Sequence, residues 1–233
     1  MGRLRMGLFE LGYGARARAL KQALAAVLAL GLGTAAAAEV TIAALGDSLT
    51  QGYGLAQGEG FVPQLEGWLR AQGEDVRVLN AGVSGDTTAG GLSRVGWTLT
   101  PEVDAMIVAL GGNDLLRGID PAASRANLRA ILEAAQAAEV EVLLVGLNAP
   151  GNYGPDYKAA FDAMYPELAA EFGALHVESF LKGLTDLPDR EGAMRDYMQP
   201  DGIHPSAAGV ARIVEAMGPA VLELVARVQA RGE

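Results

Sequence analysis

Short apolar runs that alternate with longer helical patterns are the feature of this sequence that most restricts its fold. The runs are rich in Val, Ile and Leu, and we expect strands at Val40–Leu45, Val76–Leu79, Ala105–Leu110, Val140–Leu147 and Leu175–Val177. The expected helices are Phe61–Ala71, Thr87–Thr98, Ala122–Ala138, Tyr157–Phe172 and Ala207–Val228. Near-continuous apolar strands between helices predict a parallel sheet covered on both faces, which is a three-layer α/β/α fold of the α/β class.

Composition narrows the chemistry that this fold can support. The chain has 233 residues, half of them hydrophobic, which suits one domain with a sizeable core. It has no cysteine, so disulfides, thiolate metal sites and a cysteine nucleophile are excluded. Its two histidines are too few for a three-histidine zinc site. The net charge of −10 argues against nucleic-acid binding, which normally requires a basic face.

Residues 1–38 differ from the rest of the chain and are predicted to be a secretory signal peptide. Five basic residues precede an uncharged stretch over 23–38 that ends in Thr34 and four alanines. This stretch is shorter than the roughly 20 apolar residues of a membrane-spanning helix. Without the five basic residues and one acidic residue of this segment, 13 Lys and Arg oppose 27 Asp and Glu. We therefore expect a single acidic domain over residues 39–233, located in the periplasm or secreted, without stable membrane insertion.

The first expected strand is followed by Gly46-Asp47-Ser48-Leu49-Thr50. In such a sheet, chemistry is expected in the loops at the carboxyl ends of the strands, and this sequence places a serine hydroxyl there. A serine is a weak nucleophile unless a base activates it. Taken alone, Ser48 is more often a helix cap, and the Gly-x-Ser-x-Gly elbow of α/β-hydrolases is absent because Thr50 takes its last position.

Glycines and an asparagine follow the next two strands. Gly82 and Gly85 flank a short segment after the second strand, where an unobstructed backbone N–H of either glycine would suit an oxyanion. Asn113 follows Gly111-Gly112 after the third strand and offers uncharged N–H donors. Each segment read alone is explained equally well as an ordinary turn.

The expected base lies just ahead of the last helix. Asp201 precedes His204 by three residues on a loop constrained by Gly202 and Pro205, so its carboxylate can reach Nδ1 and set the tautomer. An isolated pair of this kind is commonly structural. The other histidine, His176, lies in an apolar stretch and is read as a strand residue.

Four separated segments thus supply a nucleophile, a backbone donor, an amide donor and a base. In this order, Gly46-Asp47-Ser48-Leu49, Gly85, Gly111-Gly112-Asn113-Asp114 and Asp201-Gly202-Ile203-His204-Pro205 resemble the four signature blocks of the SGNH, or GDSL-type, hydrolase superfamily. The resemblance covers nearly the whole chain after residue 39. Within the superfamily it is strongest to secreted bacterial esterases of the acyl-CoA thioesterase, lysophospholipase and arylesterase type.

The resemblance implies a flavodoxin-like five-stranded parallel sheet and assigns roles to the residues. Ser48 would be the nucleophile, His204 the general base and Asp201 its orienting carboxylate. The oxyanion would be bound by the backbone N–H groups of Ser48 and Gly85 and by the side chain of Asn113. The residues alone leave Gly82 and Gly85 undecided, and the family pattern favours Gly85.

The expected reaction is hydrolysis of carboxylic esters or thioesters of single acyl chains through an acyl-enzyme, with no cofactor and no metal. The partner would be a small-molecule acyl ester or thioester. No long apolar insertion reads as a lid, so we expect an open groove lined by the loop over residues 147–154. Leu115, Leu116 and Tyr153 are candidates for contact with the acyl chain, and packing within the loops is an equal explanation of all three.

Three alternatives remain at this stage. A carbohydrate O-acetylesterase would be expected to present aromatic platforms, yet the only tryptophans are Trp68 and Trp97, both in expected helices. A metal-dependent phosphoesterase would use hard ligands such as Asp47, Asp86, Asp114, Asp201 and His204. A secreted binding domain without catalysis would keep the fold and show no acyl-enzyme burst.

Overall fold

The structure is a computed structural model and describes residues 39–231, so the predicted signal peptide over 1–38 lies outside the described residues. The strands are β1 (Val40–Gly46), β2 (Val76–Gly82), β3 (Ala105–Ala109), β4 (Glu141–Val145) and β5 (Leu175–Val177). The longer helices are α3 (Phe61–Ala71), α4 (Thr88–Thr98), α6 (Pro121–Ala137), α7 (Pro155–Phe172) and α10 (Ala207–Arg231). Shorter helical segments are α2 (Ser48–Gln51), α5 (Gly112–Leu116), η1 (Gly151–Tyr153), α8 (Lys182–Thr185) and α9 (Arg190–Tyr197).

The five strands form one parallel sheet in the order β2-β1-β3-β4-β5. This is the flavodoxin-like strand order, and it confirms the predicted fold class. The chain winds outward in one direction from β1 to β2 and in the other from β1 through β3 to β5. Ligands of such sheets bind at this switch point, in the crevice beyond the carboxyl ends of the central strands.

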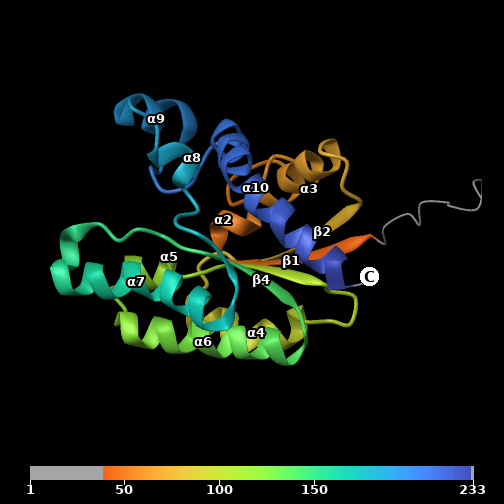
Figure 1. Cartoon of the computed structure of the whole chain (residues 1–233). Coiled ribbons are helices and arrows are strands. Elements are labelled where there is room, and N and C mark those ends of the chain that lie inside the picture. Colours follow the sequence, from red (N-terminus) through yellow and green to blue (C-terminus); the bar gives the residue numbers. More distant parts are fainter. Residues whose placement is uncertain (1–38, 232–233) are drawn as a thin grey trace, which may run out of the picture. The chain divides into compact units, whose positions relative to one another are not determined.

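Helices cover both faces of the sheet. Figure 1 shows α3 and α10 on one side and α4, α6 and α7 on the other. Val40, Ile42 and Ala44 of β1 belong to the core beneath α3 and α10, whereas Ala43 and Leu45 belong to the opposite core. Successive strand residues point to opposite faces, so a strand buried on both sides must be apolar at nearly every position. This is why β1 reads as a continuous apolar run.

The register brings the carboxyl ends of the central strands to one level. Gly46 at the end of β1 pairs with Gly82 of β2 on one side and with Ala109 of β3 on the other. The three segments that follow these strands therefore leave the sheet side by side.

The observed elements differ from the expected ones in several places. Strand β2 runs on to Gly82, three residues beyond the expected Leu79, because its pairing with β1 continues to that residue. The short helices α2, α5, α8 and α9 were not predicted, because four to eight residues give too little helical periodicity to read. The prediction for the fourth strand was too long at both ends. The N–H of Val140 donates to the carbonyl of Ala135 in the closing turn of α6, and only from Glu141 does the chain pair with β3.

Candidate active site

Ser48 is the first residue of α2, two residues beyond the end of β1. Asp47 caps this helix, because its Oδ1 accepts a hydrogen bond from the N–H of Leu49 at 3.0 Å. Gly46 is required by close packing: a Cβ there would collide with the side chain of Thr50. Ser48 therefore lies at the start of a helix, where the helix-cap alternative placed it. The capping atom, however, belongs to Asp47, so the serine hydroxyl is free of this role.

His204 connects Ser48 to Asp201. Nε2 of His204 lies 2.9 Å from Oγ of Ser48, and Nδ1 lies 2.6 Å from Oδ2 of Asp201. Oδ1 of Asp201 accepts hydrogen bonds from the backbone N–H of His204 at 3.0 Å and of Ile203 at 2.9 Å. These bonds, the one from the His204 backbone foremost, lower the pKa of Asp201 to about 2. The carboxylate thus stays ionised at any ordinary pH, and it favours the tautomer in which Nδ1 carries the proton and Nε2 faces Ser48.

Gly85 lies in a tight turn between β2 and α4. The N–H of Asp86 donates to the carbonyl of Val83 at 3.1 Å, and Gly85 has φ +84. Among the described residues other than glycine, only Glu139 has a positive φ, so Ser84 does not, and the turn is of type II. In a type II turn the central peptide is rotated by about half a turn relative to type I, so this conformation decides which way the N–H of Gly85 points.

The structure separates the two glycines that the residues alone left undecided. The N–H of Gly82 is bonded to Oδ1 of Asn80 at 2.9 Å, and the Cα of Gly82 packs so tightly on the backbone of Gln51 that a Cβ would collide with it. Gly85 instead lines the cavity beside Ser48, and its carbonyl accepts a hydrogen bond from Nη2 of Arg117 at 2.8 Å.

Asn113 lies in α5 and faces Asp47. Its Nδ2 donates to Oδ2 of Asp47 at 3.3 Å. The following residue, Asp114, is fully buried and accepts hydrogen bonds from the N–H and hydroxyl of Thr88, at 2.8 and 2.6 Å, and from the hydroxyl of Ser124 at 2.8 Å. Since Thr88 begins α4 directly after the turn that holds Gly85, this carboxylate ties the segment of Asn113 to the segment of Gly85.

Burial raises the pKa of Asp47 to about 6. The hydrogen bonds from Leu49 and Asn113 oppose this effect, as does the proximity of His204, but they do not cancel it. Asp47 is only 3% exposed, so water contributes little to the solvation of its charge. A carboxylate directly before Ser48 is thus held in place at an energetic cost, which is common at functional sites.

An open cavity of about 380 Å³ lies over these groups. Its lining includes Ser48, Gly85, Asn113 and His204 together with apolar side chains, which are Leu49, Leu115, Leu116, Leu147, Leu181 and Ile203. Leu115 and Leu116 thus lie where the sequence placed an acyl-chain contact. Tyr153 lies outside this lining: its ring packs on that of Tyr157, at 4.9 Å between centroids, and its hydroxyl donates to the carbonyl of Leu116. Of the loop over residues 147–154, Leu147 and Asn148 line the cavity.

Several lining residues were not foreseen from the sequence, Tyr53 and Leu181 among them. The ring of Tyr53 lies against the imidazole of His204, with 4.6 Å between centroids and 36° between planes, and it is half exposed. An aromatic residue in a loop carries no periodic signal. The one local feature of the sequence that indicates a turn here is that Tyr53 lies between Gly52 and Gly54. Both of these glycines have positive φ in the structure.

Residues considered for other functions lie elsewhere or have other partners. His176 is in β5, where burial lowers its pKa. Trp68 contacts Gly218 of α10, and Trp97 is exposed on α4; neither lines the cavity. Asp86 is paired with Arg94 and Asp114 with Thr88 and Ser124. Within residues 39–231, no three His, Cys, Asp or Glu side chains are grouped as metal ligands would be.

The fold and the site together define a class of protein. A hydroxyl, an imidazole and a carboxylate that are linked in this order, in the crevice of a doubly wound sheet, are the arrangement of a hydrolase of the serine type. The chain belongs to the GDSL-like lipase/acylhydrolase family, whose sequence profile matches residues 44–212. It is accordingly an enzyme that hydrolyses ester bonds, as the sequence predicted.

Known relatives agree with this assignment. Esterase TesA of Pseudomonas aeruginosa is 41% identical over 203 residues, which are 87% of this chain and 98% of that protein. Thioesterase 1/protease 1/lysophospholipase L1 of Escherichia coli is 38% identical over 73% of this chain and 78% of its own length. Among solved structures, AlinE4, an esterase of the SGNH-hydrolase family, is 45% identical with a TM-score of 0.64, over 79% of this chain and 96% of its own.

Proposed function

We propose that this enzyme hydrolyses carboxylic esters and thioesters of single acyl chains through an acyl-enzyme formed on Ser48. One observation carries the proposal. Oγ of Ser48 and Nε2 of His204, from segments 156 residues apart, lie 2.9 Å from one another, and both residues line a largely apolar cavity. This is the geometry that a weak nucleophile needs in order to be activated by a base.

In the acylation step, Oγ of Ser48 attacks the carbonyl carbon while Nε2 of His204 accepts the hydroxyl proton. Asp201 stabilises the imidazolium that forms, through its bond to Nδ1. The negative charge on the carbonyl oxygen is bound by the backbone N–H groups of Ser48 and Gly85 and by Nδ2 of Asn113. When the tetrahedral adduct collapses, the bond to the leaving group breaks, and His204 gives its proton to the departing alkoxide or thiolate.

The deacylation step uses the same groups with water as the nucleophile. His204 accepts a proton from the water as its oxygen attacks the acyl carbon, and then returns a proton to Oγ of Ser48 as the acyl group leaves as a carboxylic acid. Since both half-reactions pass through one serine, ping-pong kinetics are expected.

The shape and polarity of the cavity support a single acyl chain as the substrate. Its apolar surface consists mainly of leucines, and among residues 39–231 the ionisable groups that line it are Asp47, Tyr53 and His204. An aliphatic chain loses contact with water there, at roughly 25 cal/mol for each Å² that is buried. The names of the relatives, an esterase and a thioesterase with lysophospholipase activity, agree with esters and thioesters of such chains.

For the cellular location, the proposal is that residues 1–38 direct export and that residues 39–233 form the hydrolase domain, located in the periplasm or secreted. The support is the order of basic, apolar and small residues in that segment. In the part of the chain described by the structure, no helix has the length and apolar character to cross a membrane.

The test is a series of p-nitrophenyl esters and acyl thioesters of graded chain length, assayed with the wild type and with Ser48→Ala. We expect turnover of both leaving-group classes by the wild type and its loss in a folded Ser48→Ala variant. Full activity of that variant would refute the proposed nucleophile. Release of acetate from polysaccharide with no action on longer acyl chains would replace the proposed substrate class.

A further inference from the structure

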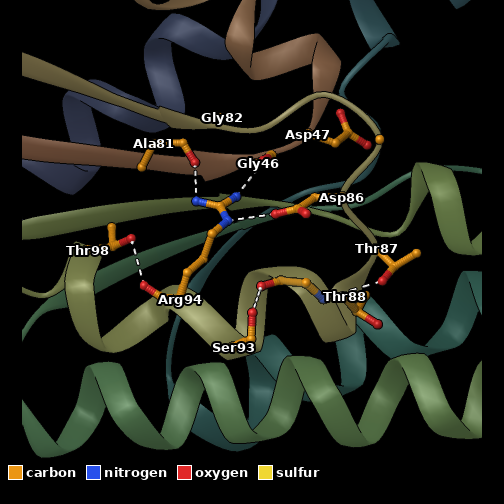
Figure 2. A network of polar contacts seen from close by, with 12 residues as sticks. Gly46, Asp47, Ala81, Gly82, Asp86, Thr87, Thr88, Ser93, Arg94 and Thr98 are labelled. Atoms are coloured by element: carbon orange, nitrogen blue, oxygen red, sulfur yellow. Dashed lines mark hydrogen bonds and ion pairs between the residues drawn. The ribbon is translucent and has the colours of Figure 1, made fainter.

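Arg94 of α4 joins three chain segments beside the site, as Figure 2 shows. Nη2 donates to the carbonyl of Gly46 at 2.8 Å, and Nη1 donates to the carbonyl of Ala81 at 2.6 Å. Nε donates to Oδ2 of Asp86 at 2.6 Å, within an ion pair. The guanidinium thus bonds to the end of β1, to β2 one residue before its end, and to the loop that follows β2.

This arrangement is largely shielded from water. The side chains of Arg94 and Asp86 are 16% and 19% exposed. Arg94 does not line the cavity that contains Ser48; it lies at a separate hollow bordered by Trp97 and Thr98. Any effect of Arg94 on the reaction must therefore be transmitted through the groups that it holds.

Two of those groups, the carbonyl of Gly46 and the carboxylate of Asp86, fix the two ends of the turn that carries Gly85. At the start of the turn, the N–H of Val83 donates to the carbonyl of Gly46 at 3.0 Å, which is the same oxygen that Arg94 bonds. At the end of the turn, Asp86 is held by Nε of Arg94. Both ends are thereby tied to Gly46, which precedes Ser48 by two residues.

From this geometry we infer that Arg94 is a positioning residue that sets the distance between the N–H of Gly85 and Ser48, and hence aligns two of the oxyanion donors. The inference rests on the proposed function. Donors of this kind act only when they are placed where the charge develops, and small displacements greatly reduce their effect.

The chemistry of the side chain explains why an arginine occupies this position. A planar guanidinium can direct three N–H groups at three acceptors in one plane, whereas the ammonium of lysine is a point charge on a flexible stem. Lysine would leave at least one of the carbonyls of Gly46 and Ala81 without its bond, and the turn could then shift.

The positioning role predicts a specific kinetic pattern. Because the oxyanion exists only in the tetrahedral transition state, displacement of Gly85 lowers kcat and leaves KM nearly unchanged. The same displacement weakens the binding of an alkyl boronic acid, because this inhibitor forms a tetrahedral anion on the serine. The loss in affinity should be similar in factor to the loss in kcat. If Arg94 were only structural, its substitution would lower the free energy of unfolding, but kcat and boronate affinity would not fall together.

The experiment compares Arg94→Lys with Arg70→Lys, using p-nitrophenyl butyrate and an alkyl boronic acid. Arg70 is a suitable control because its Nε and Nη2 donate to the carbonyl of Val76, at 3.1 and 2.9 Å, at the opposite end of β2. We expect kcat and boronate affinity to fall together by about 10–100-fold in Arg94→Lys, and neither to change in Arg70→Lys. If Arg94→Lys does not fold, Asp86→Asn takes its place, because it removes the charge at the end of the turn. The same parallel loss in kcat and boronate affinity is then expected of Asp86→Asn.

The inference is overturned if folded Arg94→Lys, or Asp86→Asn in its place, keeps kcat within about twofold of the wild type. It is also overturned if the losses in kcat and boronate affinity diverge, or if Arg70→Lys loses as much. A failure of the proposed function looks different, because the wild type itself would then show no hydrolysis that depends on Ser48.

Discussion

Oδ2 of Asp47 accepts a hydrogen bond from Nδ2 of Asn113 across 66 residues of sequence, so the carboxylate beside the proposed nucleophile orients one of the proposed oxyanion donors. A carboxylate accepts but cannot donate, and it therefore forces the NH₂ group of Asn113, rather than its carbonyl oxygen, toward the serine side of the site. The same carboxylate is buried, and its pKa is raised to about 6.

Asp47→Asn should make the folded protein more stable and at the same time lower its catalytic rate. Above pH 6 the folded wild type carries a buried charge that the variant lacks, so we expect the variant's free energy of unfolding to be higher, by up to about 3 kcal/mol. The amide cannot accept from both Leu49 and Asn113 as the carboxylate does, so kcat should fall at least about 10-fold. Urea unfolding at pH 8 and steady-state kinetics measure the two effects.

The gain in stability should depend on pH. Between its ordinary pKa of 3.8 and about 6, Asp47 is protonated in the folded protein but ionised in the unfolded chain. The folded state then binds more protons, so the contribution of Asp47 to stability falls as the pH rises through this interval. The advantage of Asp47→Asn should therefore be largest above pH 6 and vanish below pH 3.8. A variant less stable than the wild type at pH 8 would contradict the assigned cost of burial.

Gly85→Ala tests the turn directly. The nearest atom to an added Cβ would be Nη2 of Arg117 at 3.8 Å, so there is room for a methyl group, but the φ of +84 is unfavourable for alanine by about 1–2 kcal/mol. Relief of this strain would rotate the peptide that carries the proposed donor, so we expect kcat to fall by about 10²-fold with little change in KM. Gly96→Ala is the matched control within α4, because Gly96 has open space around it and no positive φ; it should raise the melting temperature and leave kcat unchanged. Equal activity of the two variants would exclude a role for the turn.

Asp201→Asn should leave the fold intact and remove most of the activity. The pKa of Asp201 is lowered to about 2, so its carboxylate holds His204 in one tautomer at every pH of interest. An amide can present its NH₂ group to Nδ1 and favour the other tautomer, in which Nε2 carries the proton and cannot accept one from Ser48. We expect kcat to fall by about 10³–10⁴-fold, with an unchanged circular dichroism spectrum. Loss of less than about tenfold would show that His204 does not depend on this carboxylate.

Leu116→Ala tests the acyl-chain surface. Leu116 lines the cavity and is 61% exposed, so it offers apolar area to an acyl chain. Its truncation should lower kcat/KM for p-nitrophenyl octanoate by about 3–10-fold, and that for the acetate hardly at all. Trp97→Ala is the control, since Trp97 is an exposed apolar residue outside the cavity lining. An equal loss on acetate and octanoate would assign Leu116 to loop packing.

The fold could be predicted because its elements carry independent local signals. The central strands β1, β3 and β4 are buried at nearly every position and read as apolar runs, whereas the edge strands β2 and β5 are only partly buried. The five expected helices each span about three turns or more. The one-turn helices α2 and α5 have no such signal, although they hold Ser48 and Asn113. The residues of the site could still be located, because the segments after parallel strands must meet at one edge of the sheet.

The supporting residues were missed for a physical reason. Arg94 bonds to Gly46, which is 48 residues away, and Tyr53 packs on His204, which lies 151 residues further along the chain. Neither contact leaves a pattern in the neighbouring sequence, since a single arginine on a helix reads as a solvated residue. Tyr153 shows the reverse case: its place after β4, at the correct edge, suggested a contact with the acyl chain, but its ring packs against Tyr157 and it is not among the residues that line the cavity.

The most direct test of the account is to locate the acyl group during turnover. The wild type should release one equivalent of p-nitrophenolate per chain in a burst from p-nitrophenyl butyrate, and rapid acid quenching followed by peptide mass spectrometry should place a butyryl group on Ser48. A butyryl group on any other residue, or turnover that proceeds with no acylated chain even when deacylation is slowed, would contradict the account.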